Sequence, residues 1–108
     1  MISSNDFEKI DMRVGTIISA AEFPKAKKPA YQLQIDFGPL GIRSSSAQIT
    51  DLYSPEELAG KQVIAVINFP PRQIANFSSE CLVLGVYSAT GVVLLQPGQA
   101  VMNGDKIG

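Results

Sequence analysis

The chain has 108 residues, of which 45% are hydrophobic and 18% are charged, and its formal net charge at pH 7 is −1. This length fits a single domain over residues 1–108, and the abundance of apolar residues at low net charge excludes a disordered chain. Because the net charge is near zero, a nucleic-acid site requires a local basic patch rather than a generally positive surface.

The residue types that carry much of enzyme and metal chemistry are scarce. The chain contains no histidine, so it lacks the commonest general base near neutral pH and the commonest transition-metal ligand. Its single cysteine, Cys81, lies in an apolar run and is expected to pack in the core. No glycine-rich phosphate-binding motif is present either. We therefore expect no enzymatic activity and no cofactor.

The sequence also predicts where the protein resides. No segment reaches the roughly 18 uninterrupted apolar residues that a membrane-spanning helix requires. The residues at the start of the chain have no basic segment followed by an apolar one, which is the pattern of a secretory signal peptide. We expect no membrane insertion and a cytoplasmic location.

The first predicted elements are a short helix and two strands. Asn5 and Glu8 have the spacing of a capping box, which predicts a helix over about residues 6–10. Residues 12–23 are rich in β-branched side chains and predict a strand, in which Gly15 suggests a bulge or a sharp bend. Residues 31–37 alternate between apolar and polar side chains, as a half-buried strand does.

The next elements are a turn, a polar strand and a second short helix. Glycine and proline at 38–41 predict a turn into a third strand over 42–49. Ser54 as N-cap, Pro55 at the first helical position and two following glutamates predict a helix of one or two turns that stops at Gly60.

Three apolar runs in the second half are too short for buried helices and are predicted as strands, at 63–67, 82–86 and 92–95. This order of elements in about 100 residues predicts an all-β fold. We expect a five-stranded, partly open OB-fold barrel with short helices and an additional terminal hairpin.

Two segments in the first half of the chain have functional interpretations. The loop 23–31 holds Lys25, Lys27 and Lys28 between two prolines, and it is either a solvated turn or a positive rim beside a groove. The polar strand carries Ser46 and Gln48 among other small hydrogen-bonding residues. It is either the solvent face of a sheet or a shallow trough for an extended ligand.

The third segment, 68–80, is longer than a hairpin connection requires and carries Arg72 with several polar side chains. Phe69 and Phe77 in it fit either stacking platforms and groove walls or a cap on the open end of the barrel. In an OB fold the loops on either side of the binding face open at the same end. We therefore expect the lysine loop and the segment around Arg72 to converge on one site.

Longer motifs in the same segments closely resemble the CsaA family of export-related chaperones, and the resemblance covers nearly the whole chain. These motifs are KAKKPAY (25–31), SSAQITDLY (45–53), NFPPRQI (68–74) and NGDKIG (103–108). That family belongs to the tRNA-binding-domain superfamily, whose members resemble the chain at 11–15, at 68–72 and at 79–80.

The resemblance implies a homodimer formed through the terminal extensions and a surface pocket that binds unfolded or precursor polypeptides for protein export. The basic edge it implies is Lys25, Lys27, Lys28 and Arg72, and the polar contacts it implies are Asn68, Gln73, Asn76 and Ser79. The alternative function is structure-specific tRNA binding. Against it, the superfamily's usual Ser-Gly pair is Ala47-Gln48 here, and its basic turn after Pro-Arg is Gln73-Ile74-Ala75.

Overall fold

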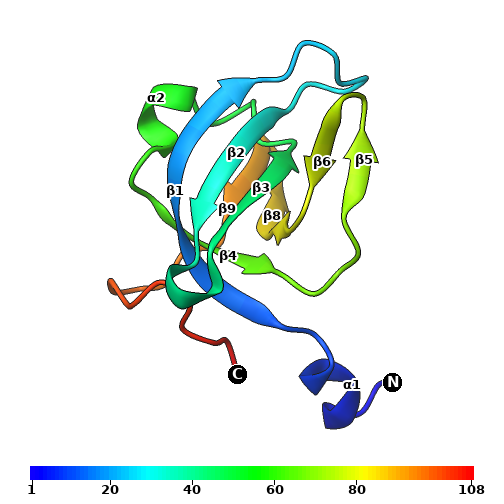
Figure 1. The fold of residues 1–108 in the computed structure, drawn as a ribbon, viewed down its shortest axis with the longest axis vertical. Coiled ribbons are helices and arrows are strands. Elements are labelled where there is room, and N and C mark those ends of the chain that lie inside the picture. Colours follow the sequence, from blue (N-terminus) through cyan, green and yellow to red (C-terminus); the bar gives the residue numbers. More distant parts are fainter.

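A curved sheet of five antiparallel strands dominates the computed structural model, which describes residues 1–108 (Figure 1). The elements in chain order are α1 (Ser4–Glu8), β1 (Met12–Glu22), β2 (Tyr31–Asp36), the 3-10 helix η1 (Gly38–Leu40), β3 (Ile42–Ala47), α2 (Pro55–Leu58), β4 (Gln62–Val66), β5 (Arg72–Ile74), β6 (Phe77–Ser79), β7 (Leu82–Val83), β8 (Gly85–Ser88) and β9 (Gly91–Leu94). The sheet order is β3-β2-β1-β4-β7, and β5–β6 and β8–β9 are separate hairpins. The predicted all-β OB-type barrel is confirmed.

The core fills the inside of the curved sheet. Leu33 and Ile35 of β2 are fully buried, while Gln34 between them is exposed, as the alternation in the sequence predicted. Leu58 of α2 is also fully buried and adds a side chain from outside the sheet. The predicted cap of α2 is present, since the Ser54 N–H donates to Glu57 Oε1 at 2.9 Å. Gly60 follows the helix with a φ of 91°, a value that favours glycine.

The barrel closes between β3 and the chain that leads into β7. There the Glu80 N–H donates to the Ser44 carbonyl at 2.8 Å, and the Ser46 N–H donates to Ser79 Oγ at 2.9 Å. The hydroxyl of Ser45, which is fully buried, donates to the Cys81 carbonyl at 2.8 Å. The serines of β3 are therefore not simply a solvent face, because their hydrogen bonds close the barrel.

Helix α1 begins earlier than the sequence predicted. Its N-cap is Ser3, whose N–H donates to Asp6 Oδ2 at 3.0 Å while the Asp6 N–H donates to Ser3 Oγ at 3.3 Å. The predicted box of Asn5 and Glu8 is wrong, since both residues lie inside the helix. The Ser3 and Asp6 pair meets the same spacing rule two residues earlier.

Gly15 was predicted to mark a bulge or a sharp bend, and the bulge of β1 lies elsewhere. The irregularity in the β1–β2 register lies between Ile17 and Ser19. A Cβ on Gly15 would lie 2.6 Å from Ile35 Cγ2 and 2.7 Å from the ring of Phe37. Glycine is required there because the side chains of Ile35 in β2 and of Phe37 just after β2 pack directly on the backbone of β1.

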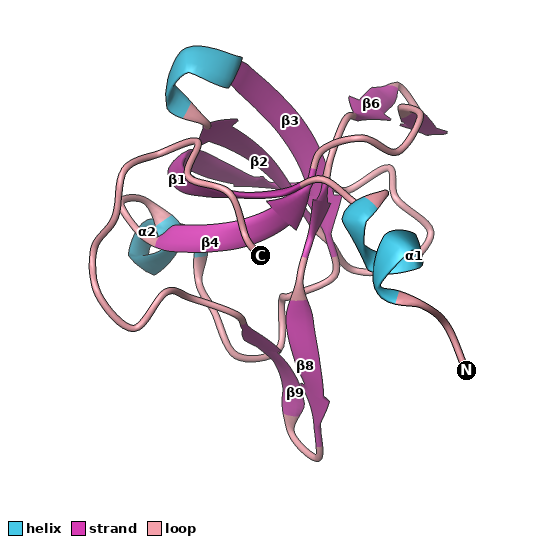
Figure 2. Ribbon diagram, turned by 90° about the horizontal axis from the view of Figure 1, so that it is seen from below, coloured by secondary structure: helices cyan, strands magenta, loops and turns pink.

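The end of the chain packs along β1. The Val14 N–H donates to the Asp105 carbonyl at 3.0 Å, and the Ile107 N–H donates to the Met12 carbonyl at 2.9 Å. Figure 2 shows α1 standing apart from the sheet and the β8–β9 hairpin projecting away from it. None of the helices is long and apolar enough to cross a membrane.

Candidate functional site

A groove of about 830 Å³ lies where four segments of the chain meet. Its lining residues are Lys25, Ala26, Lys27, Lys28 and Ala30 from the loop between β1 and β2, Ser46, Ala47, Gln48 and Ile49 from the end of β3, Arg72, Gln73, Ile74 and Ala75 from the tip of the β5–β6 hairpin, and Leu82, Val83, Leu84, Gly85, Tyr87 and Val92 from β7 to β9. The lysine loop and Arg72 thus line one groove, as the OB topology predicted.

The lysine loop is held rigidly at its base. The Phe23 N–H donates to the Ala30 carbonyl at 3.2 Å, and the Ala26 N–H donates to the Phe23 carbonyl at 3.2 Å. Phe23 is buried and meets Phe77 edge to face, with ring centroids 5.5 Å apart at an angle of 64°. This aromatic pair joins the loop to β6. Phe77 therefore packs against the base of the loop and does not offer a free ring for stacking.

The hairpin β5–β6 is an element that the sequence analysis did not predict, since it treated residues 68–80 as one long connector. Ile74 pairs with Phe77 across the turn, and Ala75 in the turn has a φ of 51°. Such a left-handed turn position is usually glycine or asparagine, so the ordinary hairpin signal was missing. The hairpin carries Arg72 and Gln73 to the groove.

Seven of the ten predicted site residues line the groove: Lys25, Lys27, Lys28, Ser46, Gln48, Arg72 and Gln73. The other three do not. Asn68 accepts from the Asp11 N–H at 2.9 Å and donates to the Lys9 carbonyl at 2.8 Å, so it ties the chain between α1 and β1 to the segment that follows β4. Ser79 accepts from β3 within the closure of the barrel. Asn76 is exposed in the hairpin turn.

The apolar floor of the groove was missed by sequence reasoning. Leu82 and Leu84 contribute to it, and Tyr87, which is 93% exposed, also lines the groove. Residues 82–86 were predicted as one strand, but the chain forms β7 and then turns into β8. That change of direction moves apolar side chains from a strand interior to the groove. Gly85, the first residue of β8, packs closely against Val92 and leaves no room for a Cβ.

Beside the groove, a carboxylate helps to hold the barrel closed. Glu80 Oε1 accepts from the Ser44 N–H and from the Ser44 hydroxyl, both at 2.9 Å. The backbone donor first, and then the hydroxyl, lower the pKa of Glu80 below its usual 4.5, because both stabilise the ionised form. Because the pKa of this carboxyl is lower in the folded than in the unfolded protein, its ionised form stabilises the fold at pH values above the unfolded pKa. This stabilisation is lost as the pH falls through the pKa of the folded protein.

We expect Glu80→Gln to lower the free energy of unfolding at pH 7 by up to about 1 kcal/mol, since the site is exposed and the charge is screened. The difference from the wild type should shrink as pH falls below 4.5. Urea denaturation at pH 7 and about pH 3 measures it. Glu8→Gln, at an exposed residue with no hydrogen-bonded partner, serves as the control. A pH-independent difference would contradict the assigned role.

Comparison with known proteins identifies the family. Residues 12–106 match the family described as "Putative tRNA binding domain". The crystal structure of the chaperone CsaA from Bacillus anthracis str. Ames is 53% identical, covers 100% of this chain and 99% of that chain, and superposes with a TM-score of 0.94. The CsaA chaperone protein from Picrophilus torridus is 55% identical with a TM-score of 0.96, and both chains are covered completely. The chain belongs to the CsaA family of tRNA-binding-domain proteins.

This CsaA-family chain is also similar to part of a larger enzyme. The methionine–tRNA ligase of Methanococcoides burtonii is 40% identical over 98 residues, which are 90% of this chain but only 14% of that ligase. The chain therefore spans a small part of the curated relative that it matches.

The motifs on which the CsaA resemblance rests meet in the structure. The segments 25–31, 45–53 and 68–74 are far apart in sequence, yet each supplies part of the groove. The fourth motif, 103–108, lies elsewhere and packs along β1. In this CsaA-family chain the groove is therefore the place where three of its characteristic segments converge.

Proposed function

We propose that the chain is a non-catalytic binding protein of the CsaA type, which holds an extended segment of an unfolded or precursor polypeptide in the groove. In this role it acts in the cytoplasm and supports protein export. The observation that carries the proposal is the combination, in one groove, of an apolar floor with a rim of four cationic side chains.

The chemistry of the groove suits an extended polypeptide. Alternate side chains of such a ligand point to opposite sides, so apolar ones can pack on Leu82, Leu84 and Tyr87 while the others face the rim. The lysines and Arg72 then interact with acidic side chains and backbone carbonyls of the ligand. Neither interaction requires a nucleotide.

Transfer RNA is the second candidate ligand. The family match and the similarity to methionine–tRNA ligases favour it. The same four cations, Lys25, Lys27, Lys28 and Arg72, would contact phosphates, while Tyr87 offers an exposed ring for stacking.

Salt dependence separates the two ligands. If the four cations bind phosphates, tRNA affinity should fall with a log-log slope of about −3, at roughly −0.7 to −0.9 per phosphate neutralised. Binding of an unfolded polypeptide on the apolar floor should change much less between about 50 and 200 mM salt. Fluorescence anisotropy with a labelled unfolded polypeptide and with labelled bulk tRNA measures both. Polypeptide binding that is absent at every salt concentration would refute the proposal.

We also propose that the protein is a homodimer built on its terminal segments. Met102 is 75% exposed and Val101 is 41% exposed, which is unusual for neighbouring apolar side chains. Ile107, a third apolar residue of this segment, is half-buried because the segment pairs with β1.

Sedimentation at micromolar concentration tests the proposed dimer. We expect a dimer for the wild type and a shift towards monomer for Met102→Asp, because a charge at an apolar interface is costly to desolvate. Leu52→Asp, at an apolar residue with 39% exposure in the turn before α2, is the matched control and should remain dimeric. A monomeric wild type contradicts the proposal.

A further inference from the structure

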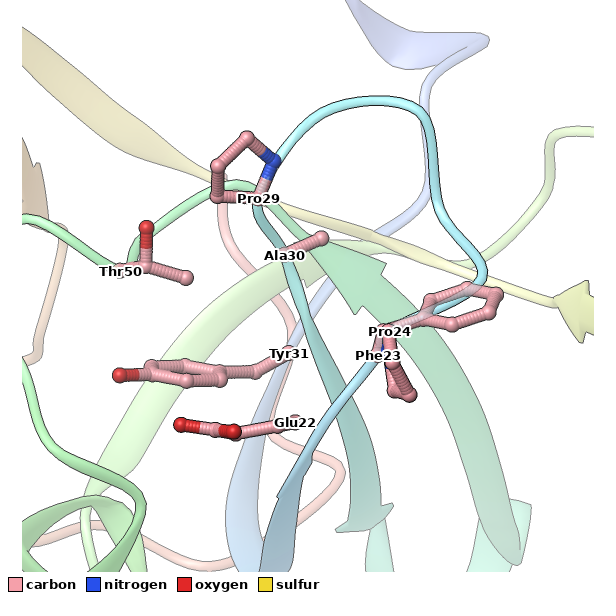
Figure 3. A pocket seen from close by; sticks show the side chains of 7 residues that line it. All are labelled: Glu22, Phe23, Pro24, Pro29, Ala30, Tyr31 and Thr50. Atoms are coloured by element: carbon pink, nitrogen blue, oxygen red, sulfur yellow. The ribbon is translucent and has the colours of Figure 1, made fainter.

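A second cavity, of about 360 Å³, lies beside the same loop that carries the lysines (Figure 3). Its lining residues are the largely apolar Phe23, Pro24, Pro29 and Ala30 together with Glu22, Tyr31 and Thr50. Ala30 lines both this cavity and the groove. The two spaces are therefore neighbours on either side of the hydrogen-bonded base of the loop.

Glu22 is an unpaired carboxylate at this cavity. It is exposed at the end of β1, and the two ion pairs of the protein, Lys9 with Asp6 and Arg13 with Asp11, do not involve it. Glu22 pairs in register with Tyr31 of β2, and Figure 3 shows their side chains extending in the same direction. The Tyr31 hydroxyl already donates to the Tyr53 carbonyl at 2.7 Å. Tyr31 therefore offers the cavity its ring rather than its hydroxyl.

Glu22 is the one charged side chain that lines this cavity, and no basic side chain lines it. Burial is the main cause that raises the pKa of Tyr31, and the charges of Glu22, Glu56 and Glu57 raise it further. All three lysines of the loop line the groove instead of this cavity. The loop therefore separates a basic groove from an acidic cavity.

We propose that this cavity binds the cationic head of a lysine or arginine side chain from the same polypeptide that occupies the groove. This inference rests on the function proposed above. The aliphatic stem of such a side chain packs on the proline rings, as long basic side chains do on apolar surfaces. Its head reaches the Glu22 carboxylate, which accepts its hydrogen bonds. The predicted ligand is a segment with a basic residue beside an apolar or acidic stretch.

A small cation tests the cavity independently of the groove. Nα-acetyl-arginine amide is titrated into the protein while the amide NMR signals of Ala30, Tyr31 and Thr50 are followed. Saturable shifts are expected for the wild type and for Glu8→Gln, a control distant from the cavity. They should be lost in Glu22→Gln, and the neutral citrulline analogue should produce none. Absence of saturable shifts, or equal shifts in Glu22→Gln, overturns the assignment of the cavity.

Two labelled peptides then test the connection to the groove. They share an apolar and acidic sequence and differ at one end, where one has arginine and the other citrulline. We expect the arginine peptide to bind the wild type about fivefold tighter, as one partly exposed ion pair allows. Glu22→Gln should abolish this difference and leave the citrulline peptide unaffected. Equal binding of both peptides by the wild type refutes the connection. If neither peptide binds, the proposed function fails, and the titration with the small cation still decides the cavity.

Discussion

Alanine in place of Phe37 is expected to lower the free energy of unfolding by about 3–5 kcal/mol, as truncation of a buried aromatic side chain typically does. Phe37 is 0% exposed, and its ring packs on Gly15 where the end of β2 lies beside β1. The strands there cannot collapse into the space, because their separation is set by the backbone hydrogen bonds of the sheet. Urea denaturation followed by circular dichroism measures the change.

The control for this variant is Phe69→Ala, which removes the same side chain from a residue that is 50% exposed. It should change the free energy of unfolding by no more than about 1 kcal/mol, since little apolar surface is lost from the core. If Phe37→Ala does not fold, Phe37→Leu provides a graded test with an expected loss near 1 kcal/mol. If Phe37→Ala and Phe69→Ala lower the free energy of unfolding equally, the packing of Phe37 on Gly15 is not at the centre of the core.

Alanine in place of Arg72 is expected to weaken the binding of an unfolded polypeptide by about 1–3 kcal/mol, which is roughly 5- to 150-fold. Arg72 is exposed at the rim of the groove and makes no hydrogen bond or ion pair through its side chain, so the free protein should keep its stability. Anisotropy titration measures affinity, and a thermal melt checks the fold. Lys106→Ala is the control, since it removes an exposed cation that does not line the groove.

Combining Arg72→Ala with Lys28→Ala asks whether the loop and the hairpin act as one site. Cations that contact the same ligand group should show a coupling energy of about 0.5 kcal/mol or more, whereas independent sites add within that error. A loss of tRNA binding with unchanged polypeptide binding would move the assignment to tRNA. If neither ligand responds to either substitution, the groove is not the binding site.

The predictions that succeeded rest on local patterns. The alternation in 31–37, the cap of α2 and the apolar run around Cys81 each involve neighbours in sequence. Cys81 is 6% exposed, and burial raises the pKa of its thiol to about 11, which agrees with a core residue rather than a reactive one.

What local patterns did not reveal depends on partners that are distant in sequence. In the sequence, Asn68 and Ser79 have the character of polar surface residues that contact a ligand. In the structure, Asn68 is hydrogen-bonded to Lys9 and Asp11, and Ser79 is hydrogen-bonded to β3. The β5–β6 hairpin was missed because Ala75 takes a left-handed conformation without the usual glycine or asparagine.

By itself, the sequence determined the first four strands of the barrel, the short second helix and the family motifs, because side-chain period and capping are properties of adjacent residues. Only the tertiary structure decided which polar side chains face the groove and that two leucines and a tyrosine line it. Only the tertiary structure likewise placed the Glu22 carboxylate at a separate cavity, across the loop from the lysines. The reason is that the closure of the barrel assigns each exposed side chain its neighbours, and closure depends on hydrogen bonds between segments more than thirty residues apart.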